Sequence, residues 1–455
     1  MFRKVLIANR GEIAVRVARA CRELNLEVVG VHSTADDAEV LRRHVDETVC
    51  IGPGPAGRSY RNAAALVEAA RKTGADAVHP GYGFLSEDPD FAEICAANDL
   101  VFIGAPAQVM ARLGDKSTAR TLMREAGLPL LPGSLEVPGD VHEAARLAST
   151  VGYPVIIKAA AGGGGNGMTV VREPGGFARA FTETRAVARA VFGDERVYVE
   201  RYLERARHVE VQVLVDDRGE GIHLGTRECS VQRRHQKLLE EAPAPGLDPQ
   251  QAAAIARDAV QGALAVGFRG AGTVEFLVDA DGRHYFMEIN CRIQVEHPAT
   301  EMVTGCDIVR EQLRVAAGLP LGLAQQDVQV RGTALECRVN VEDPANGFRP
   351  APGRIDRFLP PGGPFTRVDT HAWPGYVVGP HYDSLLAKVV VWAPQRDEAI
   401  ARADRALAEF EIAGPGVRTT IPFLRRVLAD EEFASGRYAT SLVDRLLAGA
   451  PSERR

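Results

Sequence analysis

The first 115 residues alternate between short apolar runs and segments with helical spacing. Residues 4–8 and 28–31 are apolar runs typical of buried strands. Between them, apolar residues recur at a spacing that places them on one face of a helix: Ile13, Val17, Ala20 and Leu24. The alternation continues with helices expected near 62–72 and after Pro89, and with strands at 75–79 and 100–103. This pattern predicts an α/β domain in which helices cover a parallel sheet.

The glycine-rich middle of the chain predicts a second domain. A helix expected near 115–126 is followed by a turn-rich segment that suggests a boundary, with prolines at positions 129, 132 and 138. Farther on, a strand at 155–158, a run of glycines and a strand at 169–171 succeed one another. Strand, glycines and strand together predict a hairpin that acts as a mobile lid.

From about residue 204 the pattern becomes that of an antiparallel strand with one wet face. Valines at 209, 211, 213 and 215 alternate with polar residues, among them His208, Glu210 and Gln212. Helices are expected near 250–266, 396–410 and 421–429, so this part of the chain is α+β. The resulting division is an α/β domain at 1–115, a helical linker at 116–130, a lid domain at 131–203 and an α+β domain at 204–455.

Composition narrows the class of protein. The 455 residues are 45% hydrophobic and 25% charged, as in a globular protein of several domains. With a net charge of −6, the chain lacks the excess of basic residues typical of nucleic-acid binders, so nucleic acid is not an expected partner. No apolar run is long enough to predict a membrane span or a signal peptide. Seven dispersed cysteines without a C-x-x-C pattern favour a reducing cytoplasm over a disulfide framework or a zinc ribbon.

Residues 273–290 predict a hairpin that carries a pair of acids. Asp281-Gly282 between two apolar segments is a two-residue turn signal, and its register places Glu275 opposite Glu288. Like charges in that position repel unless a cation lies between them. Asn290 faces the same way, and such oxygen ligands suit Mg²⁺ rather than zinc. The alternative is an exposed charged face of the hairpin. Phe286 and Leu277 argue against this alternative, because they are expected to lie on the same face as the acids.

Polar residues continue at even positions beyond the hairpin: Glu288, Asn290, Arg292, Gln294 and Glu296. If fully extended, this stretch would span roughly 26 Å, so either the chain bends or the site is elongated. The economical division places a metal and phosphates near Glu288 and an anion near Arg292. A guanidinium can bind a planar oxyanion through two hydrogen bonds, while Glu296 would accept a proton.

The glycine run 162–165 offers backbone N–H groups to a phosphate, although it lacks the ending of a P-loop. Lys158 and Lys116 would add the compact cations that phosphates need. A flexible surface hairpin without a ligand remains the alternative for this segment. Similarly, the basic cluster 233–237 alone is compatible with a solvated turn.

Together these motifs resemble those of biotin carboxylases of the ATP-grasp superfamily. The resemblance covers roughly residues 1–445 and rests on segments 7–14, 79–87, 162–167, 232–237 and 288–298. It implies an ATP-grasp fold with an N-terminal Rossmann-like domain, a glycine-rich lid and a C-terminal α+β domain. It also implies that ATP phosphorylates bicarbonate to carboxyphosphate, which decomposes to CO₂ and phosphate. The phosphate then takes the N1 proton of biotin, and N1 captures the CO₂.

The resemblance assigns roles residue by residue. Mg²⁺ or Mn²⁺ is implied at Glu275, Glu288 and Asn290. Binding of ATP is implied for Lys116, Lys158, Gly163, Gly164, Gly165, Glu200, Arg201, Leu203, His208, Gln232 and His235, with Glu275 and Glu288. Binding of bicarbonate or biotin is implied for Lys237, Arg292, Gln294, Val295, Arg338 and Tyr82. The catalytic set is Glu296 as the base, with Arg292, Lys237 and Arg338. For Arg338, the alternative is a surface salt bridge to Glu336.

Two departures from the family pattern concern the lid: Asn166 replaces a basic residue, and Ala161 replaces a frequent glycine. Cys291 is interpreted as a packing residue. No methionine precedes a lysine, so biotin is expected on a separate carrier protein, with a carboxyltransferase on another chain. A cytoplasmic homodimer acting in an acetyl-CoA carboxylase and in fatty acid synthesis is the leading hypothesis. The alternatives are another ATP-grasp carboxylate–amine ligase and a nucleotide-binding scaffold without catalysis.

Overall fold

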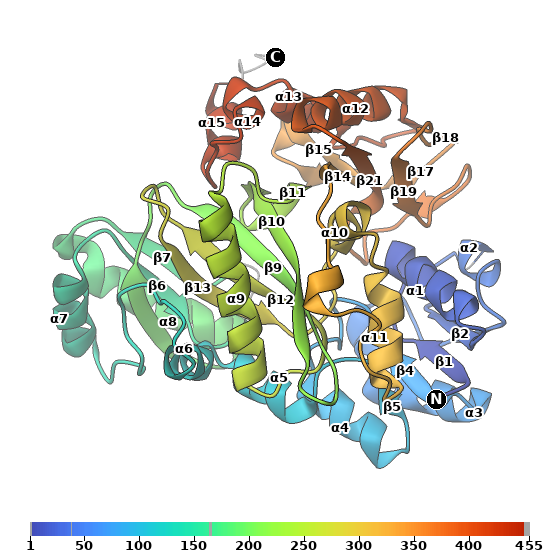
Figure 1. Ribbon diagram of the computed structural model, residues 1–455, viewed down its shortest axis with the longest axis horizontal. Helices are drawn as coiled ribbons and strands as arrows, with labels where there is room; N and C mark the ends of the chain where they lie inside the picture. The colour runs from blue at the N-terminus through green and yellow to red at the C-terminus, as the bar shows by residue number, and fades with distance from the viewer. Residues whose placement is uncertain (1, 38, 163–165, 450–455) are drawn as a thin grey trace.

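The computed structural model describes residues 2–37, 39–162 and 166–449 (Figure 1). Its N-terminal part holds a parallel five-stranded sheet in the order β3-β2-β1-β4-β5: β1 (Lys4–Ile7), β2 (Glu27–His32), β3 (Glu47–Cys50), β4 (Ala77–His79) and β5 (Val101–Phe102). The helices here are α1 (Gly11–Glu23), α2 (Glu39–Arg42), α3 (Ala63–Thr73) and α4 (Pro89–Ala97). The α/β prediction is confirmed, although the hydrophobic pattern does not predict the edge strand β3, which has no fully buried residue.

A small antiparallel sheet forms the lid region, at the left of Figure 1. Its order is β7-β6-β8, and two helices pack against it: β6 (Val155–Ala159), β7 (Met168–Val171), β8 (Val197–Arg201), α7 (Val141–Val151) and α8 (Phe177–Phe192). The sheet is preceded by α5 (Ala107–Gly114) and α6 (Lys116–Glu125). The strand, glycine and strand order is confirmed. The phosphate contacts predicted for Gly163, Gly164 and Gly165 lie outside the described residues.

The central sheet has eight antiparallel strands in the order β13-β12-β9-β10-β11-β14-β21-β19. They are β9 (Arg207–Val215), β10 (Gly221–Arg233), β11 (Gln236–Ala242), β12 (Gly270–Val278), β13 (His284–Asn290), β14 (Thr333–Asn340), β19 (Thr366–Thr370) and β21 (Leu385–Ala393). In Figure 1, α9 (Pro249–Ala265) runs along the sheet, and α11 (Ile308–Ala316) lies between the sheet and the N-terminal domain.

Helices cover both faces of the sheet's C-terminal half. Apolar residues of β14 and β21, such as Leu335, Cys337 and Val389, pack under α12 (Arg396–Glu409). The opposite face meets α10 (His297–Thr304). Because side chains alternate along a strand, that face carries Glu336 and Arg338. A charged layer is therefore buried between α10 and the sheet.

The remaining elements are short. Three two-stranded sheets pair β15 (Glu342–Asp343) with β16 (Arg349–Pro350), β17 (Gly353–Arg354) with β20 (Val377–Val378), and β18 (Arg357–Leu359) with β22 (Glu411–Ala413). The C-terminal helices after α12 are α13 (Ile421–Leu428), α14 (Glu431–Ala434) and α15 (Leu442–Ala448). Single 3₁₀ turns occur at Ala56–Arg58, Pro174–Gly176, Gln325–Asp327 and Pro344–Asn346.

The wet face predicted for β9 is wrong. Its valines pack in the same core as Ile255 and Ala256 of α9, as the alternation requires. The polar face is buried as well: Glu210 and Gln212 are fully buried. The reason is the position of β9 between β10 and β12, with a network of charged side chains over its polar face.

The hairpin of β12 and β13 differs from its prediction in its turn but not at its acids. The turn spans five residues, 279–283, because the Asp279 N–H donates to the carbonyl of Arg283 and His284 pairs with Val278. One extra residue in β13, between the partners of Phe276 and Glu275, then restores the predicted register. Glu275 therefore does lie opposite Glu288.

The bulge also changes which face the neighbouring aromatic residue occupies. Phe286 pairs with Phe276 and is buried with it in the core beside α9. The expectation that Phe286 shares a face with the acids is therefore wrong. Its side chain anchors the edge strand from below and leaves the acidic side of the hairpin open to the site.

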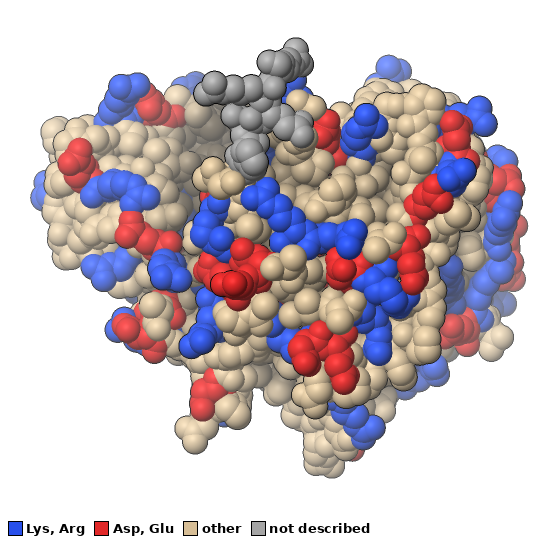
Figure 2. Space-filling view, turned by 90° about the horizontal axis from the view of Figure 1, so that it is seen from above, with Lys and Arg blue, Asp and Glu red and all other residues tan. Residues whose placement is uncertain are grey.

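The surface seen from above carries both signs of charge. Figure 2 shows Lys and Arg side chains interspersed with Asp and Glu rather than gathered in one patch. In the part of the chain that the structure describes, no helix combines the length and apolar character needed to cross a bilayer.

Candidate active site

A lysine at the start of β11 joins the acids of three segments. Lys237 Nζ donates to Glu296 Oε1 at 2.6 Å and to Glu210 Oε2 at 2.7 Å, and it lies 3.3 Å from Glu275 Oε1. Burial lowers the pKa of Lys237, but the surrounding acidic groups outweigh burial and raise that pKa well above its ordinary value. The ammonium group is therefore a fixed positive charge between the predicted metal end and the predicted base.

Glu296 lies at the end of the loop before α10 and is fully buried. Its second oxygen accepts a hydrogen bond from Arg338 Nη2 at 2.8 Å. Burial raises the pKa of Glu296, but Lys237 and Arg338 hold it well below the ordinary value. The carboxylate is thus ionised, which is the state that a proton acceptor requires.

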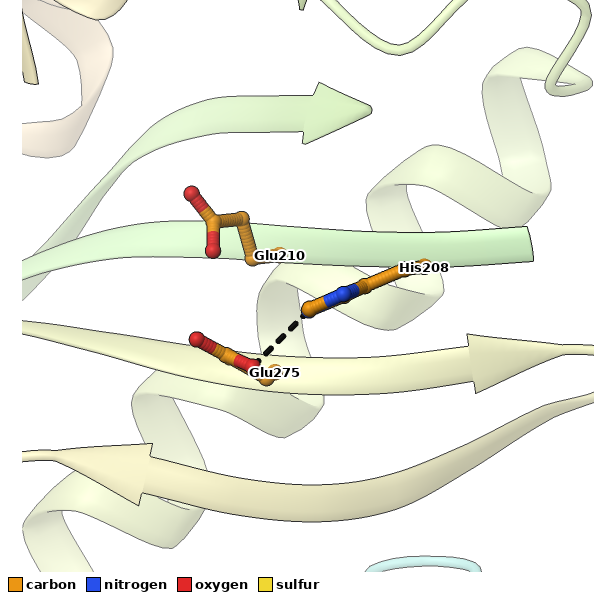
Figure 3. Close-up of side chains that lie close together, drawn as sticks. All are labelled: His208, Glu210 and Glu275. Carbon is orange, nitrogen blue, oxygen red and sulfur yellow. Dashed lines mark ion pairs between the residues drawn. The ribbon is translucent and has the colours of Figure 1, made fainter. Parts of the chain in front are cut away.

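Glu275 is surrounded by donors from neighbouring strands. Figure 3 shows His208 pointing at it from β9, with His208 Nε2 at 2.8 Å from Glu275 Oε2 and Glu210 alongside. Asn290 Nδ2 donates to Glu275 Oε1 at 2.9 Å, and Gln294 donates to the same oxygen at 3.1 Å. Glu275 of β12 and Asn290 at the end of β13, which both belong to the predicted metal set, are therefore in contact.

The third member of that set, Glu288, lies directly across the hairpin and is only partly buried. Its nearest cation is Lys116 Nζ, at 3.6 Å. Two facing carboxylates and an amide are oxygen donors, the chemistry that Mg²⁺ and Mn²⁺ prefer. Ligating atoms of His208, Glu210 and Glu275 also lie within 4.8 Å of one another. The cluster of side chains able to bind a divalent ion therefore extends to β9.

The predicted phosphate lysine of the lid is held by a buried acid. Lys158 Nζ lies 2.6 Å from Glu200 Oε2, and Arg120 of α6 pairs with the other oxygen of Glu200. Burial raises the pKa of Glu200, but Lys158 and Arg120 outweigh it and lower the pKa. The side chain of Glu200 is therefore engaged in ion pairs with two cations.

Four other residues predicted for ATP lie on β8 and the loop after it, and on the hairpin of β10 and β11. Arg201 is exposed and donates to the Val151 carbonyl, while Leu203 is partly buried. Gln232 Nε2 lies 3.3 Å from His208 Nδ1, and His235 is exposed in the tight turn between β10 and β11. The structure thus brings Gln232 to the metal end and leaves His235 at its rim.

Arg292 is held on three sides. Its Nε donates to Glu87 at 2.8 Å, and its Nη1 donates to Gln294 Oε1 at 2.6 Å. Its Nη2 lies 3.2 Å from Asn290 Oδ1. The chain therefore bends after β13, and the polar residues cluster instead of spreading along an extended strand.

Arg338 does not form the surface salt bridge that was its alternative. Its Nη2 lies 2.5 Å from Glu240 Oε1 and 2.8 Å from Glu296 Oε2. Glu336 is fully buried and faces Glu240 across the strands. Arg338 is thus part of the site. Tyr82 donates to Glu12, a buried residue of α1.

Sequence reasoning missed several residues that shape the site. Glu87 lies in the 79–87 segment and contacts both Arg292 and the backbone N–H of Cys291, but only the motif pointed to it. Glu210 pairs with the fully buried Arg227. The alternation of β9 placed Glu210 on the right face, but a surface assignment hid its role. Cys291 is buried, as its interpretation as a packing residue requires.

The fold and the site together define a class. A glycine-rich lid sheet and a large antiparallel sheet meet at a cluster of lysines and acids, which is the arrangement of ATP-grasp enzymes. Residues 1–110 match the family model "Biotin carboxylase, N-terminal domain", and residues 336–445 match "Biotin carboxylase C-terminal domain". Residues 115–324 match "Carbamoyl-phosphate synthase L chain, ATP binding domain". The chain belongs to the biotin carboxylase family and is an enzyme of that kind.

Named relatives agree with this assignment along the whole chain. Biotin carboxylase 1 of Bacillus subtilis is 51% identical over 445 residues, which cover 98% of each chain. A pyruvate carboxylase subunit of Methanothermobacter thermautotrophicus is 48% identical and matches 100% of this chain and 92% of its own. The biotin carboxylase domain dimer of the Hydrogenobacter thermophilus 2-oxoglutarate carboxylase, solved with MgADP, ADP and bicarbonate, superposes with a TM-score of 0.94 at 44% identity and 98% coverage of each chain.

Proposed function

We propose that the enzyme uses ATP and bicarbonate to carboxylate biotin on a separate carrier protein, with the residues of the Lys237 cluster as its machinery. The observation that carries the proposal is the position of Lys237, between Glu296 at 2.6 Å and Glu275 at 3.3 Å. A single fixed cation there can face a bicarbonate on one side and a nucleotide phosphate on the other. Transfer of a phosphoryl group between them needs that proximity.

At the bicarbonate end, Arg292 presents a planar guanidinium beside Gln294, and the backbone N–H of Val295 follows. An oxygen of bicarbonate would attack the γ-phosphorus of ATP and displace ADP. Glu296 would take the proton of bicarbonate in this step, so that carboxyphosphate forms with its charge balanced. Arg292 and Lys237 would orient the anion and stabilise the charge that develops on it.

At the phosphate end, Glu275, Glu288 and Asn290 are the residues that would hold a divalent ion. The oxygen-only set, and the pairing of Glu275 with Glu288 across the hairpin, fit Mg²⁺ or Mn²⁺. When bound, such an ion neutralises phosphate charge. Lys116 and Lys158 would hold the phosphates, while His208, Gln232 and His235, and the backbone of Glu200, Arg201 and Leu203, would surround the nucleotide.

At the biotin end, carboxyphosphate would break its C–O bond to give CO₂ and phosphate. The phosphate would remove the N1 proton of biotin, and N1 would attack the CO₂ carbon. Arg338, held between Glu240 and Glu296, is placed to stabilise the negative charge on the ureido oxygen. Tyr82 would line the pocket from the N-terminal domain.

We propose that a biotin-bearing carrier and a carboxyltransferase, both on other chains, pass the carboxyl group to the final acceptor. We infer acetyl-CoA as the acceptor and a homodimer as the assembly. The relatives include a 2-oxoglutarate carboxylase domain and a component of a pyruvate carboxylase. An assay of the enzyme with its native biotinylated partner against acetyl-CoA, pyruvate and 2-oxoglutarate therefore decides the acceptor.

The core of the proposal is tested with the purified chain alone. We expect ATP hydrolysis that requires bicarbonate and Mg²⁺ and that rises when free biotin is added. The matching product, carboxybiotin, is measured by trapping ¹⁴C from labelled bicarbonate. An ATPase indifferent to both bicarbonate and biotin would contradict the proposal and favour another ATP-grasp ligase.

A further inference from the structure

A fully buried lysine lies in the middle of β21 and has no part in the reaction proposed above. Lys388 has no exposed side-chain surface. In the sheet, the backbone of Lys388 lies opposite Arg338 of β14 on one side and opposite Asp369 of β19 on the other. Because a buried ammonium group is costly unless it is paired and hydrogen-bonded, the contacts of Lys388 indicate what it does.

The ammonium group of Lys388 has two close partners. Its Nζ donates to the backbone carbonyl of Val295 at 2.9 Å and lies 3.0 Å from Glu12 Oε2. The first partner belongs to the peptide that joins Val295 to Glu296, inside the proposed bicarbonate segment. The second partner belongs to α1, in the N-terminal domain. Lys388 therefore links a strand of the central sheet to two other parts of the molecule.

The contact with Val295 controls the direction of a peptide group. A trans peptide is planar, so its carbonyl and its N–H point in opposite directions. Lys388 holds the carbonyl of the Val295–Glu296 peptide, and His297 Nδ1 lies 2.8 Å from the carbonyl of Gln294. The contact of His297 with the Gln294 carbonyl fixes the direction of the Val295 N–H, which belongs to the same peptide. The contact of Lys388 with the Val295 carbonyl fixes the next peptide and with it the start of the Glu296 side chain. These are the groups proposed to contact bicarbonate.

The contact with Glu12 continues to the biotin end of the site. Glu12 is 3% exposed and also accepts a hydrogen bond from the hydroxyl of Tyr82. Tyr82, Glu12, Lys388 and the Val295 carbonyl thus form one continuous series of polar contacts. It begins at the tyrosine proposed for the biotin pocket and ends at the backbone beside the proposed base.

We propose that Lys388 is a positioning residue for bicarbonate, which fixes the Val295–Glu296 peptide and, through Glu12, ties it to Tyr82. This inference rests on the proposed bicarbonate role of residues 292–296. It differs from a structural role, in which Lys388 would only neutralise Glu12 and Asp369. A structural lysine affects folding and all kinetic constants together, whereas a positioning lysine affects chiefly the KM for bicarbonate.

The test uses two variants of the full chain. Lys388→Met keeps the length of the side chain but removes the donor. Lys388→Met combined with Glu12→Gln also removes the carboxylate that would be left unpaired, so that this variant is the more stable of the two. Bicarbonate-dependent ATP cleavage is measured with bicarbonate and ATP varied separately, after thermal denaturation has confirmed folding. Lys72→Met, at an exposed residue of α3 paired with Glu68, is the control.

Loss of a charge-assisted hydrogen bond to the bicarbonate segment should raise the KM for bicarbonate by roughly tenfold or more. The KM for ATP should stay at the wild-type value, and the control should match the wild type in both constants. An unchanged bicarbonate KM in the folded double variant would overturn the inference. Equal rises in the KM for bicarbonate and the KM for ATP would also overturn the inference, because they indicate a structural role. If the wild-type chain itself shows no bicarbonate-dependent cleavage, the proposed function fails instead.

Discussion

Glu296 owes its proposed role as a base to two neighbours that keep it ionised in a buried place. Lys237 and Arg338 outweigh burial and hold the pKa of Glu296 well below its ordinary value. Glu296→Gln keeps the shape of the side chain but removes the proton acceptor. We expect biotin-dependent turnover to fall about 10²-fold or more, with the affinity for nucleotide nearly unchanged. Steady-state assays and calorimetric titration with ADP measure the two quantities.

The matched control for this substitution is Glu411→Gln, at an exposed carboxylate of β22 paired with Arg357. It should leave turnover and nucleotide affinity at their wild-type values. Lost ADP binding in Glu296→Gln would show that Glu296 belongs to the nucleotide site and not to bicarbonate.

Glu240 makes stability depend on pH near neutrality. Burial raises the pKa of Glu240 to about 7, and Glu336 opposite it also has a pKa raised well above its ordinary value. A carboxyl group whose pKa is raised by folding stabilises the folded state below the unfolded pKa. That contribution is lost as the pH rises through about 7.

The free energy of unfolding in urea should therefore fall between pH 5 and pH 8. Glu240→Gln, which stays neutral, should flatten this fall by a few kcal/mol. Glu411→Gln serves again as the control, because its carboxylate is exposed. A Glu240→Gln profile parallel to that of the wild type would mean that Glu240 is ionised throughout the range.

At the scale of elements, periodicity predicts what depends on local sequence. The parallel sheet and the helices near 250–266 and 396–410 follow from apolar spacing, and the lid hairpin follows from a glycine run between two apolar segments. The structure contains all of them. Short strands such as β3 escape this reasoning because their residues are only half buried. The polar face of β9 differs from its prediction because alternation distinguishes the two faces of a strand without showing what covers each one.

The acidic hairpin shows how a prediction can hold despite a wrong turn. The Asp281-Gly282 signal gives a two-residue turn, whereas the chain makes a five-residue turn and then inserts one extra residue in β13. The two displacements cancel before Glu288. Turn chemistry is local, but the bulge accompanies the burial of Phe286 in a core built from distant segments, which no short sequence pattern records.

Within the lid region, one backbone contact tolerates no side chain. Gly133 forms a bridge with Glu200 of β8, and a Cβ there would lie 2.4 Å from the Val199 carbonyl. Gly133→Ala should push β8 outward, lower the free energy of unfolding by about 1–3 kcal/mol and raise the KM for ATP. Gly175→Ala, in the same domain with open space around its Cβ, is the control. Equal behaviour of the two variants in urea unfolding and in ATP kinetics would mean that the contact of Gly133 with β8 tolerates a methyl group.

At the scale of the molecule, the residues that sequence reasoning missed are those whose partners come from distant segments. Glu87 reaches Arg292 across 205 positions, and Lys388 reaches Val295 across 93. Sequence patterns report which residue types recur, and motifs report which segments matter. Neither reports which buried charge will meet which, because that depends on how the N-terminal domain packs against the central sheet.

The packing of those two parts depends on another buried acid, Glu301 of α10. One of its oxygens lies 2.7 Å from Arg16 Nη2 of α1, and the other lies 2.7 Å from Arg367 Nη1 of β19. Burial raises the pKa of Glu301, but Arg16 and Arg367 outweigh it and lower the pKa, so the acid is charged between two arginines. Glu301→Gln would leave the buried guanidinium of Arg16 and the partly buried guanidinium of Arg367 without their shared partner.

We expect Glu301→Gln to lower the free energy of unfolding by about 3–5 kcal/mol, because breaking a buried pair leaves uncompensated charge. Urea unfolding followed by circular dichroism at pH 7 measures this loss. The exposed pair of Arg357 and Glu411 supplies the comparison, since Glu411→Gln should cost at most about 1 kcal/mol. Equal losses in the two variants would mean that Asp307 and Asp369, which also pair with Arg16 and Arg367, already compensate both arginines, and that α10 does not join the domains through Glu301.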